Sequence, residues 1–241
     1  MKTYPHLKDI LFIDIETVSA EAEYASLSEP MQKAWDKKMQ YLASENGVSA
    51  SDLYFEKAGI YAEFGRVVII AAGFLRVNEE DEISLRIKSF AGEDEKDLLL
   101  DFKELVEKFN PKYLHLCAHN GKEFDFPYLC RRMVVHGISL PNALDLSGKK
   151  AWQVPHLDTM EMWKYGDRKN FTSLDLLAAL FDIEMREEVK VEGSDVNKVY
   201  YQENDLQKII NDCRQDVAVL AQVYLKLKGL PSIAEENISF V

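Results

Sequence analysis

One short apolar stretch near the start of the chain limits most strongly what the chain can fold into. Residues 11–17 read Leu-Phe-Ile-Asp-Ile-Glu-Thr, a β-branched run typical of a buried central strand. Side chains alternate across a strand, so Asp14 and Glu16 leave the same face. Two carboxylates side by side in an apolar strand repel each other and resist desolvation. Either a divalent cation binds on that face, or the strand ends there and both acids reach water.

The composition is that of one large globular domain. The chain has 241 residues, of which 47% are hydrophobic, and this is enough for a single large core. We therefore expect one domain over residues 1–241. The formal net charge of -12 excludes a basic, sequence-neutral DNA coat. It does not exclude a nucleic-acid enzyme that carries metal cations and local basic patches at its site.

Cysteine usage and hydropathy indicate a cytoplasmic protein. Cys117, Cys130 and Cys213 are scattered and form no CxxC pair, so neither a disulfide framework nor a zinc site is expected. No apolar run is long enough to span a membrane, and the first residues lack the apolar region of a signal peptide. We expect no membrane association and no small-molecule cofactor.

Residues 19–63 read as a helical insertion after the first strand. Ser28 as cap and Pro30 in the first turn predict a helix start, and Asn46-Gly47 predicts its end. The insertion either packs over the sheet edge or forms a lid over the site, because long insertions are often functional. Its apolar positions recur at helical spacing: Leu27, Met31, Ala34, Trp35, Met39 and Leu42.

The order of the remaining elements predicts an α/β fold with a mixed sheet. Strands at 65–75 and 81–90 continue the first strand as an antiparallel meander. Later strands alternate with helices, which favours parallel pairing. The sheet is therefore predicted to be antiparallel at one edge and parallel at the other, with flanking helices. These later elements are a helix at 93–109, a strand at 113–118, a helix ending near 136, a short strand at 155–160 that enters a helix, and helices at 172–181 and 203–228.

A further acid follows the strand at 113–118. Residues 119–125 read His-Asn-Gly-Lys-Glu-Phe-Asp, where Asn-Gly predicts a tight loop and Pro127 fits the first turn of a helix. Asp125 therefore lies at or beside the start of that helix. It either caps the helix or presents a carboxylate at the mouth where the strand ends.

The last helix carries two more acids. Asp212 and Asp216 are four residues apart and share a face. Asp216 lies in an apolar seam with Cys213, Val217 and Leu220, which is an awkward place for a charge unless the helix edge is solvated or the acid is functional. In the region of residues 149–169 the densest basic pairs are Lys149-Lys150 and Arg168-Lys169, which either contact phosphates or are simply solvated.

Taken together, these stretches resemble the DEDD 3'-5' exonuclease superfamily, which has a ribonuclease H-like fold. Residues 12–17 are similar to its first motif, residues 119–125 to the second, and residues 212–217 to the third. Residues 192–196 and the helix after them further resemble an uncharacterised bacterial branch related to the exonuclease domain of family B DNA polymerases. The resemblance covers nearly the whole chain, and because no polymerase domain follows in the sequence, we expect a chain that resembles a stand-alone exonuclease.

The resemblance implies a nuclease that uses two divalent metal ions, Mg or Mn. Such an enzyme releases nucleoside monophosphates from the 3' end of single-stranded DNA by phosphodiester hydrolysis. By resemblance Asp14 would bridge both ions, Glu16 and Asp216 would complete one site, and Asp125 would hold the second ion partly through water.

The resemblance also implies which residues contact the substrate. Phe124, Tyr128 or residues of the insertion are expected to stack on the terminal base, because stacking tolerates any sequence. The substrate-binding set implied by the motifs is Thr17, Asn120, Phe124 and Tyr128.

One position departs from the family pattern. A tyrosine usually stands four residues before the last aspartate in the polymerase-like branch, and a histidine stands near that point in another branch. Here the position is Asp212, which we include in the catalytic set as the group that orients the attacking water or accepts its proton. His119 and His156 are the other residues that could fill this role.

Three functions stay open at this stage. The first is a metal-dependent 3'-5' exonuclease on DNA. The second is a structure-selective endonuclease or an RNA-processing nuclease on the same fold, and the third is a non-catalytic nucleic-acid-binding module. The intact Asp14, Glu16, Asp125 and Asp216 argue against the third.

Overall fold

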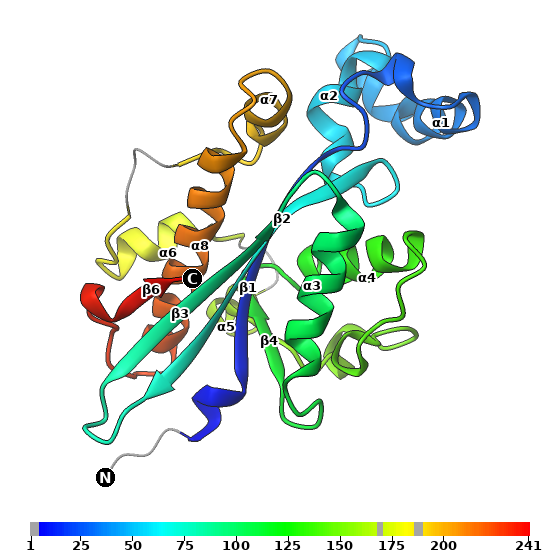
Figure 1. The fold of residues 1–241 in the computed structure, drawn as a ribbon. Coiled ribbons are helices and arrows are strands. Elements are labelled where there is room, and N and C mark those ends of the chain that lie inside the picture. The colour runs from blue at the N-terminus through cyan, green and yellow to red at the C-terminus, as the bar shows by residue number, and fades with distance from the viewer. Residues whose placement is uncertain (1–4, 168–170, 186–189) are drawn as a thin grey trace.

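The computed structural model describes residues 5–167, 171–185 and 190–241 (Figure 1). A six-stranded sheet in the order β5-β4-β1-β2-β3-β6 has helices on both faces. Within the described ranges no helix combines the length and the apolar character needed to cross a membrane. The basic pair Arg168-Lys169 lies outside the described residues.

The predicted central strand is at the centre of the sheet. β1 pairs antiparallel with β2 and parallel with β4, and β2 pairs antiparallel with β3, as the sequence predicts. β6 is an addition that the sequence does not predict, because three residues are too few to show a strand period. It pairs parallel with β3, so the expected antiparallel edge ends in a parallel pair. The strands are β1 (Ile10–Ser19), β2 (Gly65–Val77), β3 (Ile83–Ala91), β4 (His115–Ala118), β5 (Leu157–Asp158) and β6 (Ile238–Phe240).

The two faces of the sheet are covered by different helices. Leu11, Ile13 and Ile15 pack into the core on the side of α3 (Glu95–Glu107) and α4 (Asp125–Val135). Phe12 and Val18 pack into the opposite core. Because side chains alternate along β1, the acids of its motif share the face of Phe12. The helices of that side are α5 (Thr159–Lys164), α6 (Leu174–Leu180), α7 (Val196–Tyr201) and α8 (Leu206–Leu227).

The insertion packs around its own core and projects beyond the end of the sheet (Figure 1). This corrects the expectation that it packs over the sheet edge. Trp35 is fully buried, and its Nε1 donates to the carbonyl of Ala50 at 2.7 Å. Ala34, which the sequence pattern places on the apolar face of this helix, is exposed. Ala43, which is not among the predicted positions, is buried. The segment contains α1 (Glu29–Asn46), the 3₁₀ turn η3 (Ser51–Leu53), α2 (Tyr54–Lys57) and the 3₁₀ turn η4 (Ala58–Ile60).

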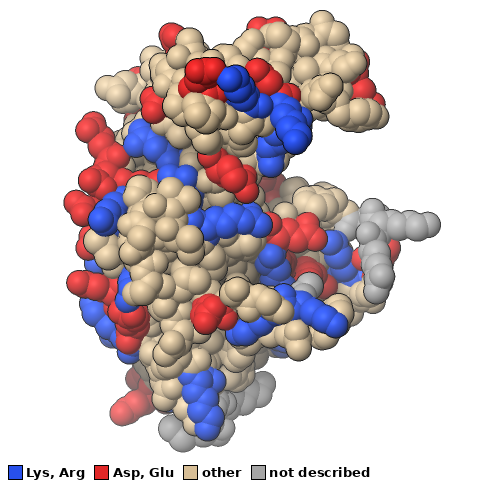
Figure 2. Space-filling model, turned by 90° about the vertical axis from the view of Figure 1, so that its right-hand side faces the viewer, with Lys and Arg blue, Asp and Glu red and all other residues tan. Residues whose placement is uncertain are grey.

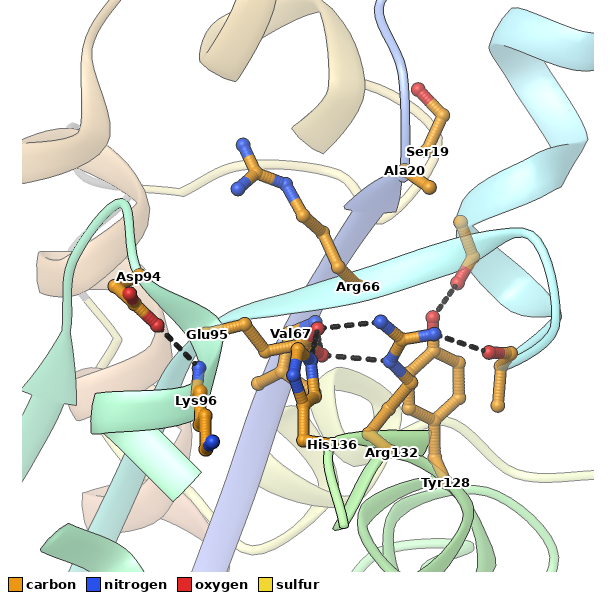
Figure 3. Close-up of polar contacts among 12 residues, drawn as sticks. Ser19, Ala20, Arg66, Val67, Asp94, Glu95, Lys96, Tyr128, Arg132 and His136 are labelled. Atoms are coloured by element: carbon orange, nitrogen blue, oxygen red, sulfur yellow. Dashed lines mark hydrogen bonds and ion pairs between the residues drawn. The ribbon is translucent and has the colours of Figure 1, made fainter. Parts of the chain in front are cut away.

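A buried ion pair ties α3 to α4. Arg132 donates from Nε and Nη2 to the two carboxylate oxygens of Glu95 at 2.9 and 2.6 Å (Figure 3). Glu95 also accepts from the backbone N–H of Val67 at 2.7 Å, and its Oε2 lies 2.7 Å from Nε2 of His136. Burial acts to raise the pKa of Glu95, but hydrogen bonds from Arg132, Val67 and His136 outweigh it, so the pKa lies below the ordinary value. Full hydrogen bonding is the condition under which a buried ion pair is tolerated.

We expect Glu95→Gln to lower the free energy of unfolding at pH 7 by about 3–5 kcal/mol, because Arg132 is left buried without its counter-charge. The folded pKa of Glu95 lies below the unfolded one, so the carboxylate stabilises the protein fully above the ordinary glutamate pKa. That stabilisation is lost as the pH falls through the folded pKa. Urea unfolding should therefore show that the difference in the free energy of unfolding between wild type and Glu95→Gln becomes smaller as the pH is lowered from 7 to 3.

The matched control is Glu107→Gln on the same helix, whose partner Lys103 forms a more exposed pair. This substitution should cost less than about 1 kcal/mol. If Glu95→Gln loses little unfolding free energy at pH 7, or loses the same amount at every pH, the stabilising role of the Glu95–Arg132 ion pair is contradicted.

Candidate active site

Three carboxylates from β1 and α8 meet on one face of the sheet. The ligand oxygens of Asp14, Glu16 and Asp216 all lie within 4.8 Å of one another, and each residue is half-buried. Close packing of α8 on the sheet brings them together. A Cβ on Gly73 of β2 would lie 2.7 Å from Cγ1 of Val217, so only glycine lets α8 approach this closely.

Asp125 enters from the other side of β1. The β1–β4 pairing ends at Phe12 and Cys117, and the chain then turns through residues 119–124 to Asp125, the first residue of α4. Asp125 is buried, and hydrogen bonding from the backbone of Ile15 reaches its carboxylate. It lies outside the group of three acids, but its charge raises the pKa of Asp14. The four acids therefore gather just beyond the point where the parallel pairing of β1 with β4 ends, and ligands of parallel sheets usually bind beyond the carboxyl ends of the strands.

The loop between β4 and α4 is held by Asp158, which the sequence reading missed. Its buried carboxylate at the end of β5 accepts from the backbone N–H of Asn120 at 3.0 Å and of Lys122 at 3.1 Å. It also caps α5 by accepting from Met160 and Glu161. The signal in the sequence was an acid at a helix N-terminus, which identifies a cap but not the loop it also binds. Asp158 thereby fixes the approach of the chain to Asp125.

Electrostatic strain in this cluster has a clear physical cause. Burial raises the pKa of Asp14 and Glu16 well above their ordinary values, and repulsion from the neighbouring acids adds to this. Burial likewise raises the pKa of Asp125 and of Asp216 to about 7. Oδ2 of Asp14 is buried and has no hydrogen-bond partner among the described residues. A hard divalent cation would accept this oxygen as a ligand and offset the repulsion, so the donor set fits such an ion.

Asp212 lies beside the three-acid group without being part of it. It is one helical turn before Asp216, is 3% exposed, and its charge raises the pKa of Glu16 and Asp216. Burial raises its own pKa to about 6, opposed by hydrogen bonding from the backbone of Val191 and by the charge of Lys190. The structure therefore brings the position that departs from the family pattern next to the acids.

The two histidines have no free ring nitrogen for proton transfer. Nδ1 of His119 lies 2.9 Å from Oγ1 of Thr159, and its Nε2 lies 2.8 Å from the carbonyl oxygen of Thr172. Nδ1 of His156 accepts from the backbone N–H of Leu116, and its Nε2 lies 2.9 Å from a backbone carbonyl. Burial lowers the pKa of both, to about 4 for His156. In this structure neither histidine replaces the missing aromatic residue.

Two of the expected substrate contacts have other partners in the structure. Tyr128 is 1% exposed, with its hydroxyl donating to the carbonyl of Gly59 at 2.9 Å, so its ring offers no face to a base. This corrects the expectation that Tyr128 stacks on the substrate. The hydroxyl of Thr17 donates to the same carbonyl at 2.8 Å.

The other two expected contacts keep free surface or a free polar atom. Phe124 is half-buried and its ring centroid lies 5.3 Å from that of Tyr128. Asn120 adopts a positive φ of 63°, and its Oδ1 is buried with no partner among the described residues. Phe124 therefore offers surface to a ligand, whereas Asn120 contributes a buried acceptor that no described residue satisfies.

A separate surface groove runs along the far side of α8. It is lined by Arg214, Ala218 and Phe240, among others, and contains none of the four acids. The four acids therefore lie outside this groove, and we infer the chemistry of the candidate site from its charged groups.

The fold and the acid cluster together define an α/β protein of the ribonuclease H-like class, which confirms the predicted fold class. More specifically, the chain belongs to the family described as predicted 3'-5' exonucleases related to the exonuclease domain of PolB, the family B DNA polymerases. The sequence model of this family matches residues 60–237, so β1 and most of the insertion precede the matched segment. The resemblance drawn from the sequence is confirmed.

Among solved structures, the fold is similar to that of a family B DNA polymerase from the hyperthermophilic archaeon Pyrobaculum calidifontis. The TM-score is 0.53 at 16% sequence identity, covering 90% of this chain and 24% of the polymerase. This chain thus spans about a quarter of that polymerase, and the likeness concerns the fold alone. No significant relative was found among curated proteins.

In the metal-free protein we expect Asp216→Asn to unfold at the same temperature as wild type or higher at pH 7–8. The folded pKa of Asp216 is raised, so the folded state prefers the protonated acid, and the penalty grows as the pH rises from the unfolded pKa toward about 7. Thermal unfolding from pH 5 to pH 8 should show wild type losing more stability than the variant. Magnesium or manganese should then stabilise wild type more than the variant, because binding to the folded state raises stability.

Asp101→Asn, at an exposed position on α3, is the control and should change neither the pH dependence nor the response to metal. An Asp216→Asn protein that unfolds well below wild type without metal would assign Asp216 a structural role instead.

Proposed function

We propose that this chain is a metal-dependent 3'-5' exonuclease that releases nucleoside monophosphates from the 3' end of single-stranded DNA. The observation that supports this most directly is the convergence of Asp14, Glu16 and Asp216, with Asp125 beside them, in a chain of this family. Oδ2 of Asp14 has no hydrogen-bond partner among the described residues, and a bound cation would both supply a partner for this oxygen and reduce the repulsion among the carboxylates.

Two divalent cations, Mg or Mn, suit these oxygen ligands. Asp14 would contact both ions, Glu16 and Asp216 would complete one set of ligands, and Asp125 would serve the second. When bound, such cations lower the pKa of water and compensate the charge of the phosphodiester.

The protein's own side chains position the substrate and move a proton. Phe124 precedes Asp125 and offers its partly exposed ring to the terminal base, because base stacking is tolerant of sequence. Oδ1 of Asn120 is buried without a partner among the described residues, and we assign it as the acceptor for a donor group at the end of the strand. Asp212, next to Glu16 and Asp216, accepts a proton from the attacking water or orients that water.

The test is digestion of 5'-labelled single-stranded DNA, with RNA of the same sequence in parallel. We expect a ladder that shortens by single nucleotides from the 3' end, activity with magnesium or manganese, and none in excess EDTA. Asp14→Asn should remove nearly all activity and leave the circular dichroism spectrum unchanged. Internal cuts would support a structure-selective endonuclease instead. Stronger digestion of RNA than of DNA would support an RNA-processing enzyme. Undiminished hydrolysis in excess EDTA would refute the metal dependence.

A second experiment addresses Asp212. We expect Asp212→Asn to lower turnover by about tenfold to a hundredfold, the lower part of the range for proton transfer by a positioned side chain. The metal concentration that gives half-maximal activity should stay unchanged. Asp216→Asn is the comparison, because there we expect that concentration to rise steeply. Unchanged turnover in Asp212→Asn would rule out the proton-transfer role, and a large rise in the metal requirement would make Asp212 a ligand.

A further inference from the structure

The insertion meets the candidate site at one carbonyl group. The carbonyl of Gly59, in the turn η4, accepts from Oγ1 of Thr17 at 2.8 Å and from the hydroxyl of Tyr128 at 2.9 Å. A carbonyl oxygen has two lone pairs, and these donors occupy both. Thr17 directly follows Glu16 on β1, and Tyr128 lies one turn after Asp125 on α4. Both acid-bearing segments therefore hold the same residue of the insertion.

Two glycines make this junction possible. A Cβ on Gly59 would lie 3.2 Å from the carbonyl oxygen of Thr17. A Cβ on Gly65, where the insertion returns to β2, would lie 2.4 Å from the Tyr128 hydroxyl and 2.8 Å from the carbonyl oxygen of Val18. Any side chain on Gly65 would displace the Tyr128 hydroxyl and press on backbone, so the close approach depends on glycine.

The buried ion pair of α3 and α4 holds the next residues of the insertion. Nη1 of Arg132 donates to the carbonyl of Ala62 at 2.9 Å, while the rest of its guanidinium is bound to Glu95 (Figure 3). Residues 59–62 are thus fixed to α4 at two points, through Tyr128 and Arg132. The position of this segment relative to Asp125 is set by hydrogen bonds and not only by packing.

Ile60 is the exposed side chain of this fixed segment. Ala58 and Ala62, two residues before and after it, are 0% and 2% exposed, whereas Ile60 is 51% exposed. Leaving an isoleucine in water forgoes about 1.5–3 kcal/mol of burial. Single exposed apolar residues are common on protein surfaces, but this one adjoins Gly59, which is held by Thr17 and Tyr128 of the two acid-bearing segments.

Ile60 has a counterpart on the other side of Tyr128. The Tyr128 ring packs against Phe124, and the Tyr128 hydroxyl binds the residue before Ile60. Tyr128 therefore connects two apolar residues that keep exposed surface, because its ring contacts Phe124 and its hydroxyl holds the residue before Ile60. Figure 2 shows a hollow between the projecting upper part of this face and the body below, with acidic and basic side chains intermixed along it.

We propose that Ile60 contacts a base at the 3' end of the bound strand, so that the insertion forms one wall of the substrate cleft and Phe124 lies on the opposite side. This inference rests on the proposed function. The chain is strongly acidic, with a net charge of -12, so its overall charge provides no general attraction for the phosphates of a strand. Apolar contact with base faces is independent of charge and of sequence. Tyr128 and Arg132 act as positioning residues for this wall.

The experiment separates contact with the bases from the chemistry. Ile60→Ala is compared with wild type on 5'-labelled oligo-dT and on bis(p-nitrophenyl) phosphate, a phosphodiester without a nucleobase. We expect KM for the oligonucleotide to rise about tenfold, with kcat and hydrolysis of the small ester unchanged, and Ile60→Leu to restore the low KM. In the inactive Asp14→Asn background, the Kd for fluorescent oligo-dT should rise by the same factor when Ile60→Ala is added.

Leu100→Ala is the matched control, because Leu100 is a 40% exposed apolar residue on α3, away from the acids. It should change none of these quantities. An unchanged KM and Kd in Ile60→Ala would overturn the contact while the exonuclease function stands. Equal losses on both substrates would also overturn it, because Ile60 would then support the fold. Absence of any hydrolysis by wild type would count against the proposed function, and the Kd comparison would still decide the contact.

Discussion

The constraint on which the rest of the structure depends is the repulsion among half-buried carboxylates on one face of β1. Asp14, Glu16 and Asp216 are held within 4.8 Å of one another, although burial and mutual repulsion both oppose their ionisation. Such an arrangement persists only when the surrounding packing fixes it. The close approach of α8 to the sheet over Gly73 supplies this packing, because it sets the distance between the helix that carries Asp216 and the strand layer that carries Asp14 and Glu16.

The same constraint explains why so many polar contacts lead to Asp125. Strand pairing does not fix the position of Asp125, because the pairing of β1 with β4 ends at Phe12 and Cys117, before the chain reaches Asp125. Asp158 instead fixes the loop before it, and Tyr128 and Arg132 fix the helix after it to the insertion. Hydrogen bonds between segments far apart in the sequence therefore set the position of Asp125. The positions of Asp14, Glu16 and Asp216 are set by one strand, β1, and one helix, α8.

This difference decides how much the sequence could predict. Strand alternation placed Asp14 and Glu16 on one face, and helical spacing placed Asp212 beside Asp216, because both depend on local geometry alone. Tyr128 was expected to face the substrate, but its burial depends on Gly59, which is 69 residues away. The insertion was expected on the sheet edge because its apolar face is visible in the sequence, whereas its partner surface, a core of its own around Trp35, is not. β6 was too short to leave a pattern, and the second role of Asp158 depends on a contact across 38 residues.

An acidic protein that binds a polyanion must separate two tasks that a basic protein combines. Under the proposed function, cations held by the carboxylates would neutralise the phosphate at the reacting bond, while phosphates more than about 10 Å away would be screened from them at 0.1 M salt. Contact with the bases would help to hold the strand, and such contact needs apolar surface at a fixed distance from the acids. The junction at Gly59 would meet that requirement for the proposed wall at Ile60, since the hydrogen bonds that define it come from the same two segments that carry Glu16 and Asp125. A displacement of either segment would therefore move the wall together with the ligands, and the spacing between binding and chemistry would be preserved.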